Sequence, residues 1–284
     1  VSLMSGNEVL SHIDTSKYSP QKFLIKKDGT FDFNIDDLKK LDVVFIALHG
    51  DSGENGIIQG FLESLNIPYT GPGVLGSALG MDKHLAKSLW KEAGLPVIPH
   101  KIVKSVQECM TSPLPFVLKP RSQGSSVGIT IVKKENQIKK AFEDASQYEC
   151  DVMLEPYVKG KELTVGVLGK PIKALPLIEI IPEKEFYDYD AKYISDKTKY
   201  IVPAKLPDKM TRKIQDIAVK ACEVLKIGGF SRVDFMLQEN NTLLMEVNTI
   251  PGLTSHSLLP KAAKAKGISF PSLIDLMIKY SLKA

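Results

Sequence analysis

The sequence predicts an α/β protein built from two or three compact lobes. Its 284 residues, 43% of them hydrophobic, exceed what a single small core requires. Short apolar runs typical of strands alternate with segments of helical periodicity, which indicates helices packed on sheets. We find no internal repeat and no low-complexity tract, which argues against a solenoid.

The composition argues against several classes of protein. The balance of 37 basic and 33 acidic residues gives a net charge of only +4, without a run of five like charges, which disfavours a dedicated nucleic-acid binder. No apolar run reaches about 18 residues, and the start VSLMSG does not resemble a secretion signal. Cys109, Cys150 and Cys222 are too few and too scattered for a disulfide framework or a metal site. We therefore expect a cytoplasmic protein without nucleic-acid or membrane partners.

The first lobe is expected to span residues 1–77. Residues 43–48 (VVFIAL) form a short apolar run that predicts a buried parallel strand ending at His49 and Gly50. The loop HGDSGENG then leads into a helix over 56–66, and a second extended piece follows at 69–73. Loops at the carboxyl ends of such strands are where functional residues are expected.

The second lobe is expected to span residues 78–155 and to open with a helix capped by Asp82. Its apolar face is predicted from Leu85, Ala86, Leu89, Trp90 and Ala93, with Gly94 as its stop. Strands at 116–120 and 127–132 are joined by the polar loop RSQGSS, which predicts a hairpin. A helix through Ile138, Ala141, Phe142 and Ala145 and a strand at 152–156 complete the lobe.

The third lobe is expected to span residues 156–284. It begins with strands at 162–168 and 172–180, followed by an irregular stretch at 186–200. A helix follows with an apolar face of Ile214, Ile217, Ala218, Ala221 and Leu225. Strands at 230–237 and 242–248, the loop TIPGLTSHSLLP and two terminal helices close the chain.

A candidate metal site follows from the two last strands. Glu246 and Asn248 are two residues apart on one strand, so their side chains lie on the same face, and Asp234 comes from the neighbouring strand. Carboxylate and amide oxygens suit Mg²⁺, whose remaining positions are filled by phosphates and water. The alternative is a solvated sheet face with acidic residues placed by chance, and spacing alone leaves both interpretations open.

Seven blocks in the same order resemble the D-alanine–D-alanine ligase family of the ATP-grasp superfamily. They are HGDSGENG, GMDKHLAKSLW, LKPRSQGSSVGI, LEPYVKGKELTV, FYDYDAKYISD, GGFSRVDFML and LLMEVNTIPGLTSHSL. The resemblance implies an ATP-grasp fold of three lobes, the first containing a parallel sheet, with ATP bound between the central and C-terminal lobes. It also implies a homodimer that joins two D-alanine molecules through an acylphosphate for peptidoglycan precursor synthesis, using ATP and two Mg²⁺ or Mn²⁺ ions.

The resemblance also assigns roles around ATP. Lys83 and Lys119 match the family's phosphate-binding lysines, although either one alone is more simply explained as a solvated surface residue. The Gly- and Ser-rich loop 121–128 has the flexible backbone needed to close over phosphates, or to form an ordinary hairpin turn. Three further positions match the hinge that contacts adenine and one matches the ribose-binding glutamate, namely Glu155, Tyr157 and Val158, and Glu162.

Further residues match those at the family's amino-acid subsites. Arg232 and the backbone N–H of Gly252 match the donors to the tetrahedral oxyanion, although Gly252 after Pro251 also fits a simple turn. Matches to the substrate-binding positions are His49, Ser257 and Leu258, where His49 alone is better explained as a strand-end histidine bonded to backbone. Matches in the family's hydrogen-bonded network and mobile loop are Ser125, Lys192 and Tyr193.

Two alternatives remain at this stage. Another ATP-grasp ligase, such as one forming D-alanyl-D-lactate, is disfavoured because the Lys192-Tyr193 pair matches the dipeptide-forming members. A nucleotide-binding module without catalysis is the second, because the family's glutamate precedes the position of VSLMSG and is absent from this sequence. We expect that an upstream segment supplies it.

Overall fold

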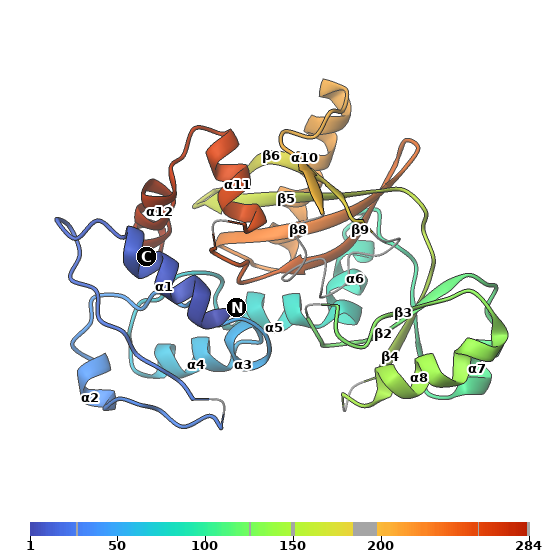
Figure 1. Ribbon diagram of the computed structural model, residues 1–284, viewed down its shortest axis with the longest axis horizontal. Coiled ribbons are helices and arrows are strands. Elements are labelled where there is room, and N and C mark those ends of the chain that lie inside the picture. Colours follow the sequence, from blue (N-terminus) through green and yellow to red (C-terminus); the bar gives the residue numbers. More distant parts are fainter. Residues whose placement is uncertain (27, 125, 149–150, 184–197, 255, 283–284) are drawn as a thin grey trace.

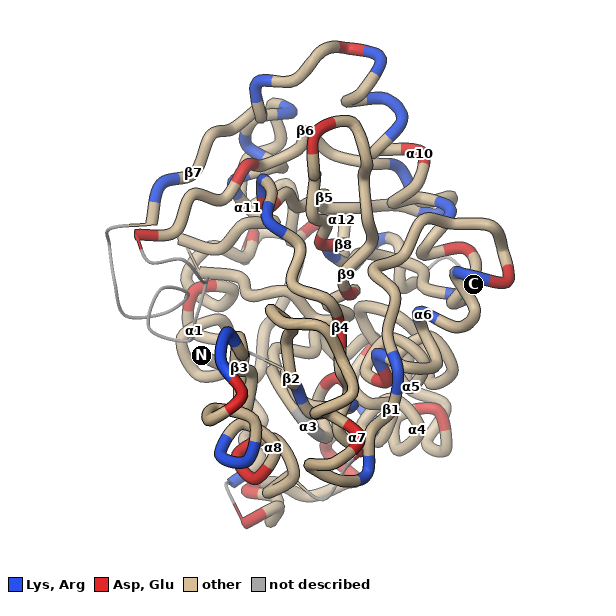
Figure 2. The backbone as a smooth tube through the Cα atoms, turned by 90° about the vertical axis from the view of Figure 1, so that its right-hand side faces the viewer, with Lys and Arg blue, Asp and Glu red and all other residues tan. Residues whose placement is uncertain are grey.

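The computed structural model describes residues 1–284 except 27, 125, 149–150, 184–197, 255 and 283–284. Helices and two antiparallel sheets make up the described part (Figure 1). The four-stranded sheet lies at one end of the molecule, and the five-stranded sheet lies beside the helices from both ends of the chain (Figures 1 and 2). Among the described residues, no helix combines the length and apolarity needed to traverse a bilayer.

The N-terminal part combines irregular segments with five helices, α1 to α5, at Ser2–His12, Ile35–Leu38, Asp51–Glu54, Ile57–Ser64 and Val74–Met81. The strand expected at 43–48 is not a regular strand. Only one parallel bridge forms, between Val44 and Tyr69, and no neighbouring pair within the described residues extends it into a ladder. The run nevertheless contributes to the interior, since Ile46 is buried with Leu62 in a small hydrophobic core. The parallel sheet expected in this lobe is therefore reduced to this bridge.

The four-stranded sheet is formed by β1 Lys101–Val103, β2 Phe116–Pro120, β3 Thr130–Val132 and β4 Val152–Pro156, in the order β1-β4-β2-β3. The predicted hairpin of β2 and β3 is confirmed, although β3 begins later than expected. Helices α7 Val106–Met110 and α8 Ile138–Ser146, the second preceded by a short 3₁₀ turn at Glu135–Gln137, bury one face of the sheet. The other face carries Lys119 and Glu155, diagonal neighbours on the adjacent strands β2 and β4.

The five-stranded sheet has the order β7-β6-β5-β8-β9. Its strands are β5 Lys161–Gly169, β6 Ile172–Ile181, β7 Lys199–Ile201, β8 Gly229–Gln238 and β9 Asn241–Asn248. Helix α10 Asp208–Val224 covers one face, and α11 Leu258–Ala265 with α12 Phe270–Leu282 covers part of the other. These strands and helices confirm the elements expected in the third lobe, and α12 also packs against α1. The boundaries between lobes at 77 and 155 stay predictions.

Helix α6 Lys83–Glu92 joins the two sheets and differs from expectation in the face that it buries. Asp82 caps it, accepting from the Leu85 N–H at 2.9 Å. Of the predicted apolar face, Ala86 and Trp90 are buried as expected, whereas the prediction is wrong for Leu85 and Leu89, which are exposed by 40% and 38%, and for the exposed Ala93. The buried face consists of Lys83, Ala86, Lys87 and Trp90. Its two lysines are tolerated there because the Lys83 ammonium bonds to the Gln123 carbonyl and the Lys87 ammonium pairs with the Glu155 carboxylate.

Candidate active site

Four polar side chains form a compact group on β8 and β9. Arg232 lies opposite Asn248 and Asp234 lies opposite Glu246 in the antiparallel register, so all four share one face of the sheet. A β-bulge directly follows the Asp234–Glu246 pair. The extra residue, Met245, allows both Leu244 and Val247 to face the apolar core while Glu246 stays on the polar face.

Asp234 is held by two neighbours. The Arg232 guanidinium binds it in a fork, with Nε to Oδ1 at 2.9 Å and Nη2 to Oδ2 at 2.8 Å. Thr164 Oγ1 on β5 donates to Asp234 Oδ1 at 2.6 Å. The paired, charge-assisted bonds orient both side chains before any ligand is bound.

The three oxygen donors fit a divalent cation such as Mg²⁺. Two are carboxylates, and the third, Asn248 Oδ1, is buried without a hydrogen-bond partner among the described residues. A buried amide oxygen is rarely left unsatisfied unless an ion or a water completes it. No three His, Cys, Asp or Glu side chains in the described part of the chain gather as a metal group, and the predicted site accordingly counts the Asn248 amide as its third ligand. The metal role stays a prediction.

Lys83 approaches this group from α6, and Lys119 pairs with a carboxylate in the four-stranded sheet. Lys83, at the start of α6, donates to the carbonyl of Gln123 in the Gly-rich loop, and its Nζ lies 3.7 Å from Glu246 Oε2. Lys119 Nζ, on β2, lies 2.8 Å from Glu155 Oε2 on β4. The structure therefore brings both predicted phosphate-binding lysines next to carboxylates, where each charge is compensated despite its burial.

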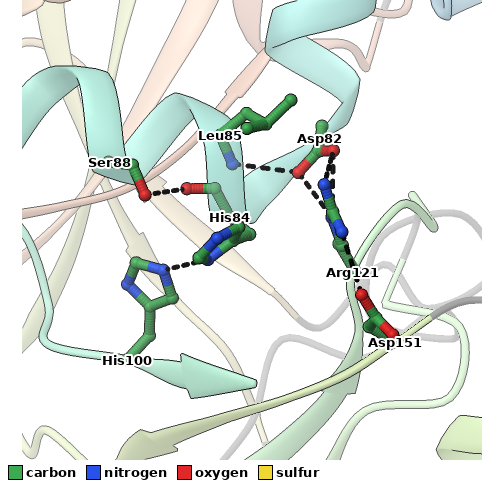
Figure 3. Close-up of polar contacts among 7 residues, drawn as sticks. All are labelled: Asp82, His84, Leu85, Ser88, His100, Arg121 and Asp151. Carbon is green, nitrogen blue, oxygen red and sulfur yellow. Dashed lines mark hydrogen bonds and ion pairs between the residues drawn. The ribbon is translucent and has the colours of Figure 1, made fainter.

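The Gly-rich loop is anchored at its first residue, Arg121, whose guanidinium lies between Asp82 and Asp151 (Figure 3). Its guanidinium bonds Asp82 through Nε and Nη2, the latter at 2.6 Å, and Asp151 through Nη1 at 2.9 Å. Further along, Gly128 has a φ of +69°, and a Cβ there would lie 2.8 Å from the Pro120 ring, so only glycine fits. The loop is thus tied to the start of α6 and to the residue before β4.

His84 and His100 form a pair beside this anchor, with Nδ1 of His84 2.9 Å from Nε2 of His100 (Figure 3). Burial and, to a smaller extent, the nearby Lys87 ammonium lower the pKa of His100 to about 4. His100 is therefore neutral at neutral pH. This histidine pair was not singled out in the sequence, because one member lies on α6 and the other just ahead of β1.

The loop between β9 and α11 is held by the N-terminal part of the chain. His49 Nδ1 lies 2.8 Å from the Ile250 carbonyl, so this nitrogen carries the proton and donates it. His49 Nε2 is 2.8 Å from Ser5 Oγ, which in turn accepts from the Leu253 N–H at 3.2 Å. Both ring nitrogens are thus bonded within the protein. Gly252 lies between Ile250 and Leu253, the two residues that these bonds hold, and a Cβ on it would lie 2.8 Å from Ser257 Oγ.

Comparison with known proteins shows where this chain belongs. Residues 89–279 match the family model described as the D-ala D-ala ligase C-terminus, and residues 32–72 match the corresponding N-terminus. The chain belongs to the D-alanine–D-alanine ligase family. The family resemblance found in the sequence is therefore confirmed.

Individual members of the ligase family align over nearly the whole chain. The D-alanine–D-alanine ligase of Syntrophobacter fumaroxidans is 44% identical over 100% of this chain and 93% of its own length. The crystal structure of the Bacillus anthracis ligase complexed with ATP is 34% identical, with a TM-score of 0.84 over 100% of this chain and 92% of its own. The VanG D-Ala:D-Ser ligase of Enterococcus faecalis is 31% identical, with a TM-score of 0.86 over 98% and 94%. The ATP-grasp fold expected from the sequence is confirmed.

The ligase-family positions differ in how far the structure describes them. Tyr157 and Val158 follow β4 as a half-buried segment, in which Tyr157 N–H bonds the Pro115 carbonyl at 3.1 Å. Glu162 lies near the start of β5, on the same face as Thr164. Ser257 occupies the N-cap position of α11 without a side-chain capping bond, and Leu258 is buried at the first position of the helix. Ser125, Lys192 and Tyr193 lie outside the described residues, and the roles of all these positions stay predictions.

A cavity of about 650 Å³ lies apart from these residues. It is lined by residues 94–96, which follow α6, and by the first part of α10, including Asp208 and Arg212. None of the predicted site residues lines it. Its size therefore does not identify the active site, and the convergence of charged groups on β8, β9, α6 and β2 is the stronger guide.

Proposed function

We propose that this protein is an ATP-dependent ligase that joins two D-alanine molecules into D-alanyl-D-alanine through an acylphosphate. One observation supports it above the others, the 3.7 Å approach of Lys83 Nζ to Glu246 Oε2. It joins a predicted phosphate-binding cation to the predicted metal-binding carboxylates in one place. Phosphoryl transfer requires this combination, because its catalysis consists mainly of positioning and charge neutralisation.

In the first step, a carboxylate oxygen of one D-alanine attacks the γ-phosphorus of ATP, and the bond to the ADP oxygen breaks. Lys83 and Lys119 bind phosphate oxygens, and the Gly-rich loop held by Arg121 covers them through its N–H groups. Asp234, Glu246 and Asn248 would hold Mg²⁺ or Mn²⁺, which when bound neutralises charge on the phosphates. Tyr157, Val158 and Glu162 hold the adenine and ribose.

In the second step, the amine of the other D-alanine attacks the acyl carbon, and inorganic phosphate leaves after the tetrahedral oxyanion collapses. Arg232 and the Gly252 N–H donate to that oxyanion. Ser257 and Leu258 bind the carboxylate of the second D-alanine at the start of α11, where anions are favoured. No covalent bond to the protein forms in either step, so Ser125 is not expected to be acylated, and its proposed role, shared with Tyr193, is the one that the family resemblance implies.

A related ligase with a different second substrate is the main competing proposal. The likeness to a D-Ala:D-Ser ligase shows that this fold accommodates another acceptor. The Lys192-Tyr193 pair favours D-alanine as the acceptor on sequence grounds. We further propose that the protein acts as a cytoplasmic homodimer in peptidoglycan precursor synthesis.

A competition assay tests the acceptor. The protein is given ATP, Mg²⁺ and equal concentrations of D-alanine, D-serine and D-lactate at neutral pH, and the products are separated by mass spectrometry. The proposal predicts D-alanyl-D-alanine as the main product, with one ADP formed per dipeptide. Predominance of the D-serine or D-lactate product would replace it with the competing assignment.

A further inference from the structure

Lys87 is a buried lysine to which the proposed mechanism gives no role. Its side chain is 0% exposed on the inner face of α6, one turn after Lys83. Its Nζ bonds Glu155 Oε1 closely and also donates to the Ile98 carbonyl at 3.3 Å. A fully buried ammonium is costly unless it is paired, so its position reflects a strong requirement for this partner.

Glu155 is bound by two lysines at once. Lys87 occupies Oε1 and Lys119 occupies Oε2 at 2.8 Å, while the carboxylate itself is only 3% exposed. Burial would raise the pKa of Glu155, but Lys119 and Lys87 outweigh it and hold the pKa below its usual value. Burial lowers the pKa of Lys87 to about 8, which still leaves it protonated at neutral pH. The cluster therefore contains two positive charges and one negative charge.

The two lysines differ in what they are able to do. Lys87 comes from a helix, is enclosed on all sides and makes a second bond to a main-chain carbonyl. Lys119 lies on the sheet face that the nucleotide is proposed to occupy, and it is the residue proposed to bind phosphate. Its ammonium is bound to Glu155, so a phosphate bound at Lys119 would compete with that carboxylate for the ammonium.

That displacement is expensive if Lys119 is the sole counter-ion of Glu155, because a buried carboxylate would then lose its compensation. With Lys87 in place, Glu155 keeps one charged hydrogen bond after Lys119 leaves. Lys87 and Glu155 then remain as a neutral pair, and the charge of Lys119 is available to the phosphates.

We propose that Lys87 is a positioning residue of the nucleotide site, a permanent counter-ion of Glu155 that allows Lys119 to leave this carboxylate and bind a phosphate of the incoming nucleotide. This inference rests on the proposed function, since it assumes a nucleoside triphosphate at Lys119. Lys87 itself is not expected to contact the nucleotide, because its side chain is fully buried and its ammonium is bonded to Glu155 and the Ile98 carbonyl.

The test is Lys87→Met, which keeps an unbranched side chain of similar size and removes the charge. We expect the KM and the Kd for ATP to rise about 10- to 100-fold, the range for loss of one charge-assisted hydrogen bond, while the KM for D-alanine changes little. Lys91→Met is the matched control, because it removes one charge from the exposed side of the same helix and is expected to leave the ATP constants unchanged. An ATP constant for Lys87→Met within about twofold of the control would overturn the proposal.

A double-mutant cycle shows whether Lys87 acts through Lys119. If it does, Lys87→Met adds little to the ATP constant of Lys119→Met, whereas multiplied effects would mean that the two lysines act independently and would overturn the inference. Should Lys87→Met fail to fold, Lys87→Gln retains a donor to Glu155 without the charge, and unfolding midpoints are measured for every variant. Weak ATP binding at an unchanged midpoint supports the proposal, and a loss of active protein with unchanged ATP constants contradicts it. Absence of D-alanine-dependent ATP turnover in the wild type would instead refute the proposed function, independently of Lys87.

Discussion

The buried amide oxygen of Asn248 leads to a prediction that separates stability from function. Asn248 Oδ1 has no hydrogen-bond partner among the described residues. An unsatisfied buried acceptor costs about 1–3 kcal/mol of folding free energy. Leucine has a similar shape and no acceptor, so Asn248→Leu should leave the ligand-free protein as stable as the wild type or stabilise it by about 1 kcal/mol. A gain of this size raises the unfolding midpoint by about 2–4 °C in a chain of this length.

The same substitution should remove the response to metal. A ligand present at 100 times its Kd stabilises the folded state by about 2.7 kcal/mol, so adding Mg²⁺ to the wild type with nucleotide should raise its midpoint clearly. Asn248→Leu should show little of this Mg²⁺-dependent rise and should lose at least about 10- to 100-fold in turnover. Thermal unfolding with and without Mg²⁺, at constant nucleotide, measures both effects.

The Asn248→Leu experiment has a matched control and an outcome that would contradict the metal assignment. Gln59 Oε1 in α4 is also buried without a hydrogen-bond partner among the described residues, but Gln59 is not one of the proposed metal ligands. Gln59→Leu should therefore keep the full Mg²⁺-dependent shift. If Asn248→Leu lowers the ligand-free stability by more than about 1 kcal/mol and retains the Mg²⁺ shift, Asn248 is structural and the metal assignment is wrong.

Three further predictions concern the surroundings of the site. Gly252→Ala should lower kcat with little change in global stability, because its Cβ would lie 2.8 Å from Ser257 Oγ and shift the loop; steady-state kinetics with unchanged kcat would contradict this. Burial raises the pKa of Asp82, but hydrogen bonds from Arg121 outweigh it and hold that pKa below 3.8, so the pair stabilises the fold above this pH and loses its effect as the pH falls through the lowered pKa. Asp82→Asn should thus lower the free energy of unfolding by about 1–3 kcal/mol at neutral pH and have little effect in acid. Denaturant unfolding at neutral and at acidic pH measures this, and a difference that is the same at both would contradict it. His49→Ala should reduce kcat while leaving the KM for ATP unchanged, because it releases the loop carrying Gly252, and an altered ATP constant alone would refute this positioning role.

Much of the fold was predictable because local pattern and tertiary structure agree. The strands that became β2, β4, β5, β6, β8 and β9 have apolar alternation or runs flanked by turn residues, and each forms. The prediction of a regular strand at 43–48 was wrong because an apolar run indicates burial and strand geometry together. Here only burial is realised, since a ladder needs a neighbouring strand with matching register.

The polar group on β8 and β9 was predictable in its placement for a similar reason. The period of two along a strand puts Glu246 and Asn248 on one face, and the antiparallel register then adds Asp234. The β-bulge that keeps Glu246 on that face depends on β9 packing against the core and left no sequence signal.

The features that sequence analysis missed are contacts across the chain. Lys87 was passed over because a lysine within an amphipathic helix is normally solvated, and its partner Glu155 is 68 residues away. Similarly, 39 residues separate Arg121 from Asp82, and 44 separate His49 from Ser5. One signal was available for Lys87, since it lies four residues after Lys83 and one turn before Trp90, on the face that both share.

The central claim is tested most directly by coupling ATP consumption to D-alanine. The purified protein is incubated with ATP and Mg²⁺, and ADP release and dipeptide formation are followed together as the D-alanine concentration is raised. The account predicts that ADP release requires D-alanine and equals the D-alanyl-D-alanine formed, mole for mole. ATP binding without D-alanine-dependent ADP release would contradict it and would indicate a nucleotide-binding protein without ligase activity.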